Sequence, residues 1–182
     1  GFAKDNEIVK YIVIFLFLIS LCFFIASFVS SFFNNESVDI TVDNVNEYIM
    51  NEDNEIDTSK IVTNYSTFYT VQSTIENFVD YLLKKDYDKT YDVLSDSMKE
   101  KYSRSDYVSK IEKLTNDNFA ANSSDEDYVN QNKLHNAYEV ADNSYICDYY
   151  GKGNKIVRFG VTLNYSNYKY EIFLIDFGEE NK

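Results

Sequence analysis

Histidine and cysteine are the side chains of this 182-residue chain that could support a nucleophile or a metal ion, and it has one histidine and two cysteines. A Ser-His-Asp or Cys-His relay would have to use His135, and neither a G-x-S-x-G turn nor a catalytic cysteine signature accompanies it. Cys147 lies in an aromatic-rich stretch, where a free cysteine usually behaves as a small buried apolar residue. A zinc site would need more ligands of these types. We therefore expect no catalytic residue, metal site, cofactor or enzymatic activity.

Three short motifs match ligand-binding or catalytic patterns by letters but lack the elements that should surround them. The sequence SNYK at 166–169 matches S-x-x-K without the partner S-D-N and K-T-G elements. The sequence GKG at 151–153 lacks the spacing and the following helix of a phosphate loop. Acidic and amide residues alternate at 51–57, but the turn glycine and the final glutamate of a calcium loop are missing. We interpret the first two as turns and the third as a solvated acidic segment.

The longest apolar stretch, Tyr11–Phe33, has 23 residues and contains no charge, glycine or proline. A helix of that length covers about 34 Å, enough to cross a hydrocarbon core of about 30 Å. A secretory signal peptide would be shorter and would end in a small-residue cleavage site, and a core helix would show a polar face. We predict a transmembrane helix here, with the lipid bilayer as its partner and residues 1–10 as a tail.

Basic residues near the two ends of this stretch predict its orientation. Lys4 and Lys10 precede it, whereas the next basic residue after it is Lys60. Positive charge near a membrane helix usually stays in the cytoplasm, which predicts a cytoplasmic N-terminus and an extracytoplasmic C-terminal part at the cell membrane. Small residues at four-residue spacing within the stretch would also allow close helix packing in a homo-oligomer.

The formal net charge is −13, and all of it comes from residues 34–182. An acidic exterior argues against nucleic acid and anionic lipid as partners, and it suits a basic partner. Cys22 lies in the apolar stretch and Cys147 in the polar part, so we expect no disulfide between them. An exported domain without disulfides is typical of a Gram-positive bacterial surface.

The polar part of the chain divides near residue 66. Residues 34–65 are acidic and show no helical period, which predicts a linker. Residues 66–178 show first a helical and then a strand period, which predicts one folded domain before a short tail at 179–182.

Three helices are predicted in the first half of this domain. Apolar residues recur at helical spacing from Phe68 to Leu83, a shorter helix follows, and a capping box opens the third helix after a polar connection at 95–102. The residues expected to cap these helices or to face inward are Ser66, Thr67, Thr70, Asp86, Ser103, Asp106, Tyr107, Ile111 and Leu114.

Four strands are predicted in the second half, after a polar loop at 115–128. The hydrophobic period there changes to two, which indicates an antiparallel sheet with one buried face. Helices followed by a meander of strands predict an α+β fold, with two or three helices packed on a curved antiparallel sheet of about four strands. The expected strands are 133–140, 144–150, 155–165 and 168–177.

The residues FVDYLLKKDYDKTYDVLS at 78–95 resemble the opening of nuclear-transport-factor-two-like domains, which are cone-shaped α+β domains. In that family a long helix leads into a D-Y-x-x-A-Y-x-x-L-S second helix, and Thr90 stands here where alanine is usual. The resemblance covers about residues 66–178. It implies helices that precede a bent antiparallel sheet.

Domains of this family can hold an apolar pocket between helices and sheet. The resemblance therefore implies a pocket that Tyr87, Tyr91, Asp148 and Tyr149 could line. The alternative, which we favour, is that these tyrosines are core aromatics with hydroxyls that reach the surface.

The layout of tail, membrane helix, linker and domain is similar to the inner-membrane assembly factor of type IV secretion and conjugation systems. This resemblance implies a non-enzymatic single-pass membrane protein that serves as a scaffold and binds other envelope or secretion-complex proteins. The N-terminal extension of some resistance transpeptidases shares the layout, but there a catalytic domain follows, and this chain ends at Lys182. The alternative function is a cell-surface domain that binds a small molecule or a peptide.

Overall fold

A computed structural model describes residues 2–33, 39–119 and 133–178 of the chain. The chain divides into two compact units, with the boundary between Asp39 and Ile40. Each unit is a structure of its own: the first is a single helix, and the second contains a sheet and its covering helices.

The first unit's helix, α1 (Phe2–Phe33), corrects the prediction of a transmembrane helix. Among the residues that the structure describes, no helix has both the length and the apolar character needed to cross a membrane. The predicted transmembrane helix at Tyr11–Phe33 is therefore wrong. The predicted location and orientation stay predictions.

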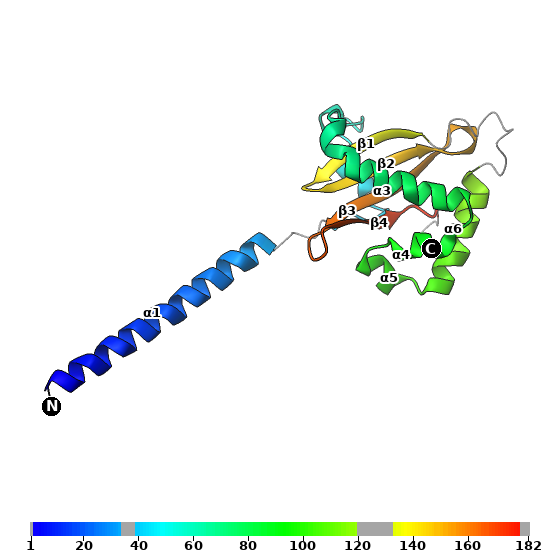
Figure 1. Ribbon diagram of the computed structural model, residues 1–182. Coiled ribbons are helices and arrows are strands. Elements are labelled where there is room, and N and C mark those ends of the chain that lie inside the picture. Colours follow the sequence, from blue (N-terminus) through cyan, green and yellow to red (C-terminus); the bar gives the residue numbers. More distant parts are fainter. Residues whose placement is uncertain (1, 34–38, 120–132, 179–182) are drawn as a thin grey trace. The chain divides into compact units, whose positions relative to one another are not determined.

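The second unit places its helices before its strands (Figure 1). This order and the antiparallel sheet confirm the predicted α+β class. In chain order the described elements are α2 (Val45–Ile49), the 3₁₀ helix η1 (Thr58–Lys60), α3 (Tyr65–Leu83), α4 (Tyr87–Asp92), α5 (Asp96–Lys101), α6 (Arg104–Asn118), β1 (Leu134–Ala141), β2 (Ser144–Tyr150), the 3₁₀ helix η2 (Lys152–Asn154), β3 (Ile156–Asn164) and β4 (Lys169–Ile175).

The four strands form one antiparallel sheet in the order β1-β2-β3-β4. Tight turns join the strands, and Asn143 and Tyr168 adopt positive φ angles of 53° and 55° in two of them. Register shifts in β1 and between β3 and β4 mark bulges, which bend a sheet. The predicted strands are confirmed, and each boundary lies within two residues of the predicted one.

We call the sheet face that belongs to the main core the inner face. Side chains at every second position of the strands join the apolar stripes of α3 and α6 there, because strand side chains alternate between faces. The inner-face residues of the sheet are Ala137, Tyr145, Cys147, Tyr149, Val157, Phe159, Val161, Ile172 and Ile175, and their main helical partners are Phe68, Val71, Ile75, Phe78, Leu82, Tyr107, Ile111 and Leu114.

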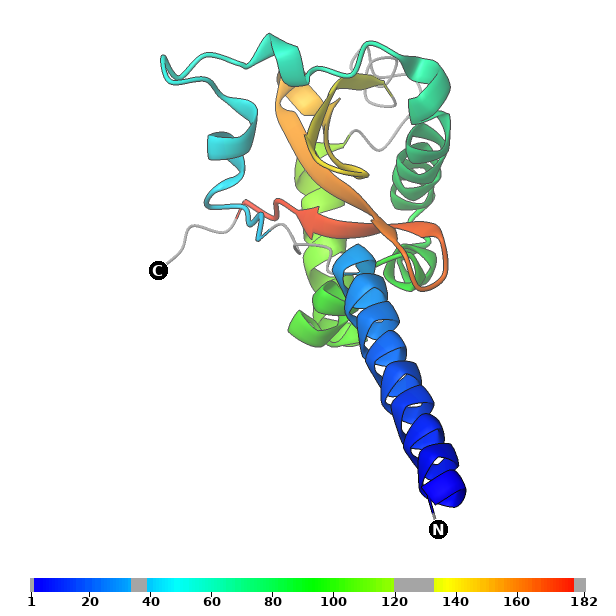
Figure 2. The ribbon, with the colours of Figure 1, turned by 90° about the vertical axis from the view of Figure 1, so that its left-hand side faces the viewer.

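Residues 40–61 cover the opposite, outer face of the sheet, where the sequence predicts only a linker. Figure 2 shows this segment (cyan) on one side of the strands and α3 on the other. Ile40, Val45 and Ile49 of this segment are buried, and so are outer-face residues of the strands. The apolar positions follow neither a helical nor a strand period, which explains why the sequence pattern did not reveal a folded segment. The buried outer-face residues are Ile40, Val45, Ile49, Tyr138, Ile146 and Leu174.

Helix caps agree only in part with the predicted ones. Ser103 accepts a hydrogen bond from the N–H of Asp106 at 3.2 Å, which confirms the capping box of α6. Asn64, outside the predicted domain boundary, caps α3 in place of the predicted residues. The predicted polar connection at 95–102 is a further helix, α5, which Ser95 caps through its hydroxyl. Part of the predicted loop at 115–128 lies outside the described residues.

Candidate functional site

The structure separates the four residues that were predicted to line a pocket. Asp148 and Tyr149 are neighbours on β2, so their side chains point to opposite faces of the sheet. Tyr149 belongs to the inner core together with Tyr87 of α4, and Tyr91 packs against that core from a half-buried position. The four residues therefore do not line one common pocket.

The hydroxyls of Tyr87 and Tyr149 are buried and have no hydrogen-bond partner among the described residues. Burial raises the pKa of both hydroxyls, and the charges of Cys147 and Glu76 add to the rise at Tyr149. The nearby Thr115 hydroxyl opposes the rise at Tyr87, yet no hydrogen bond of normal geometry joins the two groups. Both rings are core aromatics, but their hydroxyls do not reach the surface as the sequence reading expected.

Tyr91 lies between α4 and α6. Its ring contacts that of Tyr107 at a centroid distance of 5.4 Å, and the guanidinium of Arg104 lies 4.5 Å from its ring centre. Arg104 also forms ion pairs with Asp88 and Asp92 on α4. Because these ion pairs are exposed, the ring contacts hold the two helices together more effectively than the charges do.

Asp148 forms a buried ion pair on the outer face. Its two carboxylate oxygens accept hydrogen bonds from Nε and Nη2 of Arg158 at 2.7 and 3.0 Å, in a bidentate geometry. Nη1 of Arg158 donates to the side chain of Asn46 at 3.0 Å and so connects α2 to the sheet. Desolvation lowers the pKa of Arg158, but the hydrogen bond and charge of Asp148 outweigh it and the pKa is raised. The pair connects α2 to the sheet through Asn46, which gives it a structural role.

His135 and Cys147 are the residues with the most obvious chemical potential. His135 is exposed on β1 and lies against Tyr150, with a ring-centroid distance of 4.3 Å. Cys147 is fully buried, and burial followed by the charge of Asp148 raises the pKa of its thiol, which disfavours the reactive thiolate. Among the described residues no group of three or more histidine, cysteine or acidic side chains is arranged to hold a metal ion.

The three short motifs lie in turns. The side chain of Asn51 accepts hydrogen bonds from the N–H groups of Asp53 and Glu55, which satisfies a turn without any ion. Gly153 has a φ of 62° in the 3₁₀ turn between β2 and β3. The segment at 166–169 joins β3 to β4.

A cleft with a volume of about 320 Å³ opens on the second unit where the chain passes from η1 to α3. Its wall consists of residues 59–64, together with Phe68 of α3, Glu139 of β1 and Tyr145 of β2. The cleft is therefore lined by aromatic rings together with hydroxyl, amide, ammonium and carboxylate groups. Three parts of the chain that are distant in sequence create this cleft, and we take it as the candidate site.

Local hydrogen bonds hold the wall at residues 59–64 in position. Asp57 caps η1 by accepting a hydrogen bond from the N–H of Ser59 at 3.0 Å. The N–H of Val62 donates to the carbonyl of Ala137 at 2.8 Å, which fastens the segment to the free edge of β1. The wall is thus anchored at its start and at its middle before it enters α3.

The opposite side of the cleft depends on the first turns of α3. Asn64 accepts a hydrogen bond from the N–H of Ser66 at 3.2 Å and so starts the helix. Phe68 then lies one turn into the helix and meets the ring of Tyr145 edge to face, with centroids 5.4 Å apart. These aromatic rings are held by the core and cannot readily turn away from the cleft.

Electrostatics in the cleft centre on Tyr145 and Glu139. The Tyr145 hydroxyl donates to a carboxylate oxygen of Glu139 over a long distance of 3.4 Å. Burial raises the pKa of Tyr145 to about 12, and the charge of Glu139 is the next cause. Tyr145 is therefore a protonated donor at neutral pH.

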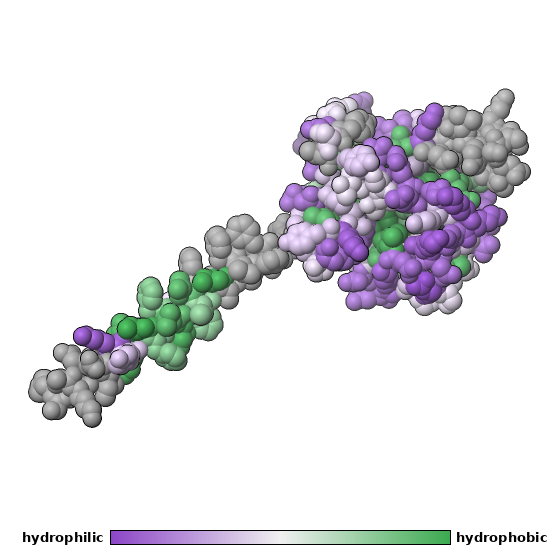
Figure 3. Space-filling view, viewed as in Figure 1, coloured by the Kyte–Doolittle hydropathy of each residue, from purple (hydrophilic) through white to green (hydrophobic). Residues whose placement is uncertain are grey.

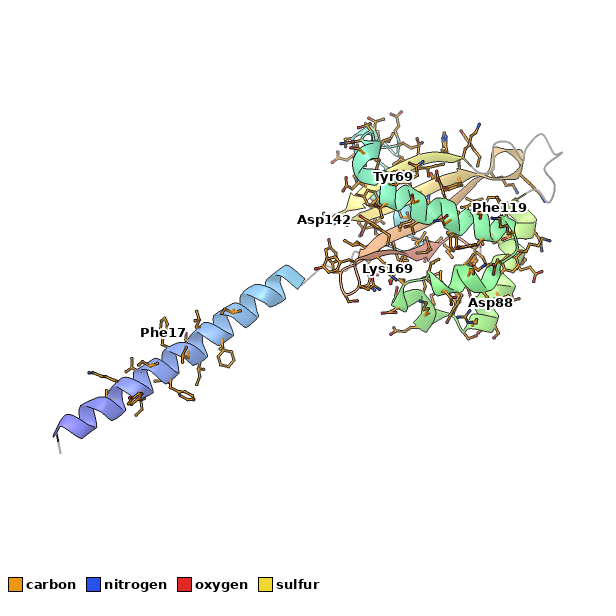
Figure 4. The ribbon with its side chains drawn as sticks, in the orientation of Figure 1. Phe17, Tyr69, Asp88, Phe119, Asp142 and Lys169 are labelled. Carbon is orange, nitrogen blue, oxygen red and sulfur yellow. The ribbon has the colours of Figure 1, made fainter. Side chains whose placement is uncertain are left out.

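A network at the turn between β1 and β2 continues from the cleft. Asn143 donates to the Tyr165 hydroxyl at 2.8 Å and to Asp142 at 3.2 Å, and it accepts from the Tyr170 hydroxyl at 3.2 Å. The ring of Tyr170 lies 6.5 Å from that of Tyr145, centroid to centroid. Figure 4 shows Asp142 at the end of the unit opposite Phe119. This end thus combines ordered tyrosines with acceptor side chains.

The sequence did not point to any residue of the cleft as part of a functional site, although Phe68 was expected on the apolar face of a helix. Glu139 shares the alternating strand positions of the core residue Ala137, but its side chain is exposed, so a charge there gave no signal of a site. No sequence pattern predicted that residues 59–64 form a wall of the cleft, because this depends on their contact with β1.

No known protein family, curated protein or solved structure matches the chain. The cleft offers hydrogen-bond acceptors, a phenol donor and aromatic side chains, which are groups that recognise a ligand.

Proposed function

We propose that this chain is a non-enzymatic binding protein whose second unit recognises another protein through the cleft at residues 59–64. The cleft is the observation that supports this most directly. Aromatic rings beside polar groups are typical of the well-packed centres of protein interfaces. Neither Cys147, which is in the core, nor His135, which is exposed on β1, lines the cleft.

A polypeptide fits this cleft better than a free small molecule does. Pockets for small molecules usually enclose about 300 to 1,000 Å³ and are mainly apolar. The cleft is at the small end of that range, and its wall is an exposed chain segment with polar side chains. A single side chain of a partner would fill it, while the partner's backbone stayed on the surface outside.

Photo-crosslinking tests the proposed binding surface. A photoreactive amino acid at Thr63, in the cleft, should give a discrete adduct with a partner protein in cells. The same amino acid at Lys101, exposed on α5, should not. Equal adducts from both positions, or none from Thr63, would remove the support for the cleft as the binding surface.

We also propose that the lipid bilayer is a partner of α1. Its large apolar side chains from Val9 to Phe23 and Ile25 are 37 to 71% exposed, and Figure 3 shows apolar colours around this part of the helix. A helix that is apolar on all sides needs an environment that surrounds it, and acyl chains provide one more simply than a single protein surface. This is proposed as lipid association alone.

Vesicle flotation tests the association with lipid. The full chain should float with neutral phosphatidylcholine vesicles, and Phe17→Glu combined with Ile14→Glu should abolish flotation. Tyr69→Glu introduces the same charge at an exposed aromatic residue of α3 and should leave flotation unchanged. Figure 4 labels Phe17 and the control position Tyr69. Flotation of the double variant would contradict the proposal.

The biological setting is a further part of the proposal. The resemblance of residues 78–95 to cone-shaped domains, together with the apolar N-terminal helix, supports a scaffold role in a Gram-positive conjugation or type IV secretion apparatus. Deletion of the gene should then reduce transfer of a conjugative element without altering growth. If the deletion strain transfers the element normally, the conjugation or secretion setting is wrong, and the proposed binding function is unaffected.

A further inference from the structure

The two charged side chains of the cleft differ in how much of their hydrogen-bonding capacity is open to a ligand. Lys60 and Glu139 are the charged side chains of its wall. The ammonium of Lys60 donates to the backbone carbonyl of Tyr48 on α2. The carboxylate of Glu139 receives, among the described residues, one long hydrogen bond from Tyr145 at 3.4 Å. A carboxylate can accept about four hydrogen bonds, so most of its capacity is open to a ligand.

A second carboxylate strengthens the negative potential beside the cleft. Asp142 is held at the β1–β2 turn by Asn143, whose side chain donates to it at 3.2 Å. The charges of Asp142 and Glu139 both raise the pKa values of Tyr145 and Tyr170, after the larger effect of burial. Contacts connect the two carboxylates, because the ring of Tyr170 lies 6.5 Å from that of Tyr145 and its hydroxyl donates to Asn143, the partner of Asp142.

We infer that the cleft receives a lysine or arginine side chain from a basic segment of the partner protein, with Glu139 as its ion-pair acceptor. Ammonium and guanidinium groups only donate hydrogen bonds, which matches an open carboxylate at the wall. The rings of Phe68 and Tyr145 suit the aliphatic stem and the cationic head of such a side chain. An anionic group would meet Glu139 and Asp142 unfavourably.

The charge of the chain as a whole supports the same partner. The formal net charge of −13 attracts a basic segment over a distance and raises the rate of encounter. Nucleic acid, the other common polyelectrolyte, would be repelled. The inference rests on the proposed function, because it names the chemistry of the partner at the same cleft.

Peptide binding to the full chain tests this inference. An arginine-containing peptide of alternating Arg and Gly should bind, and its analogue with citrulline in place of arginine should bind at least about tenfold more weakly. Glu139→Gln keeps the size of the side chain and removes its charge, and it should also weaken the arginine peptide about tenfold. Glu100→Gln on α5 removes the same charge at another exposed position and should have little effect. Isothermal titration calorimetry at fixed salt measures all four affinities.

Several outcomes would overturn the inference. Equal weakening by Glu139→Gln and Glu100→Gln would mean general charge attraction without a site. Spermidine that competes as well as the peptide would mean a site for free polyamines. If Glu139→Gln leaves the affinity for the arginine peptide unchanged while the Thr63 crosslink to the cellular partner persists in that variant, the proposed function stands and the inferred cationic side chain is wrong. If Thr63 gives no crosslink in the unmodified sequence background either, both the proposed function and this inference are wrong.

Discussion

The inner and outer faces of the sheet are covered by different means. Long helices cover the inner face with apolar side chains, and the rings of Phe78 and Phe159 meet there edge to face with centroids 5.3 Å apart. A segment with little regular structure covers the outer face, and the buried Asp148–Arg158 pair connects it to the strands through Asn46. One face thus depends on area removed from water and the other on the specific pairing of a few polar groups.

This difference predicts how strongly substitutions on each face of the sheet lower the stability of the second unit. An apolar core loses stability in proportion to the volume that is removed, because the remaining side chains relax only partly. A buried ion pair loses more from the removal of one partner than from the removal of both, because a single buried charge is left uncompensated.

Truncation at the centre of the inner face should have the largest effect. Phe159→Ala should lower the free energy of unfolding by about 4 kcal/mol, because the ring is fully buried against Phe78 and Tyr149. Phe173→Ala removes a half-buried ring that covers Gly160 on the outer side and should cost clearly less. Urea unfolding of both variants measures the difference. Equal losses would show that the two faces contribute in the same way.

Removal of one partner of the outer ion pair should come next. Asp148→Ala should lower the free energy of unfolding by about 3 kcal/mol, because Arg158 is left largely buried without its carboxylate. The double replacement of Asp148 and Arg158 by Leu should restore most of this loss, since it leaves no unpaired charge. Chemical unfolding checks both variants. A double variant less stable than Asp148→Ala would contradict this explanation of the outer face.

A polar contact within the inner side should show a smaller effect. The buried hydroxyl of Tyr107 donates to Thr90 at 2.9 Å, and Thr90 donates in turn to the carbonyl of Tyr87 at 2.7 Å. Thr90→Ala should cost about 2 kcal/mol because the Tyr107 hydroxyl loses its partner. Tyr107→Phe in the same chain should recover part of that cost, and the double-mutant cycle measures the coupling. Additive effects would mean that the hydrogen bond contributes nothing.

The smallest effect at neutral pH is expected for Tyr149→Phe, which removes a hydroxyl without a partner among the described residues. Burial raises the pKa of this hydroxyl above its ordinary value of about 10. On raising the pH, the unfolded chain therefore releases this proton before the folded chain does. The contribution of the protonated hydroxyl to the free energy of unfolding is fully present below about pH 10 and is lost as the pH rises further. Tyr149→Phe should change the stability by less than about 1 kcal/mol at pH 7 and reduce the loss above pH 10. Thermal unfolding at both pH values checks this, with the exposed Tyr168→Phe as control.

Local patterns in the sequence were sufficient for most elements of the second unit. The four strands follow from the alternation of apolar residues, and the core positions Tyr107, Ile111 and Leu114 follow from helical spacing. Thr90 has a structural role that no local pattern shows, because its partner Tyr107 is 17 residues away. The cleft was missed for the same reason.

The sequence by itself determined the α+β class, the order of the strands and the strongly acidic character, because these depend on composition and on the spacing of near neighbours. The tertiary structure alone decided that residues 40–61 cover the outer face, that Asp148 pairs with Arg158, and that residues 59–64 meet Glu139 in a cleft. The physical reason is that such contacts join positions far apart in the chain, and their free energy appears only once the sheet exists to bring them together.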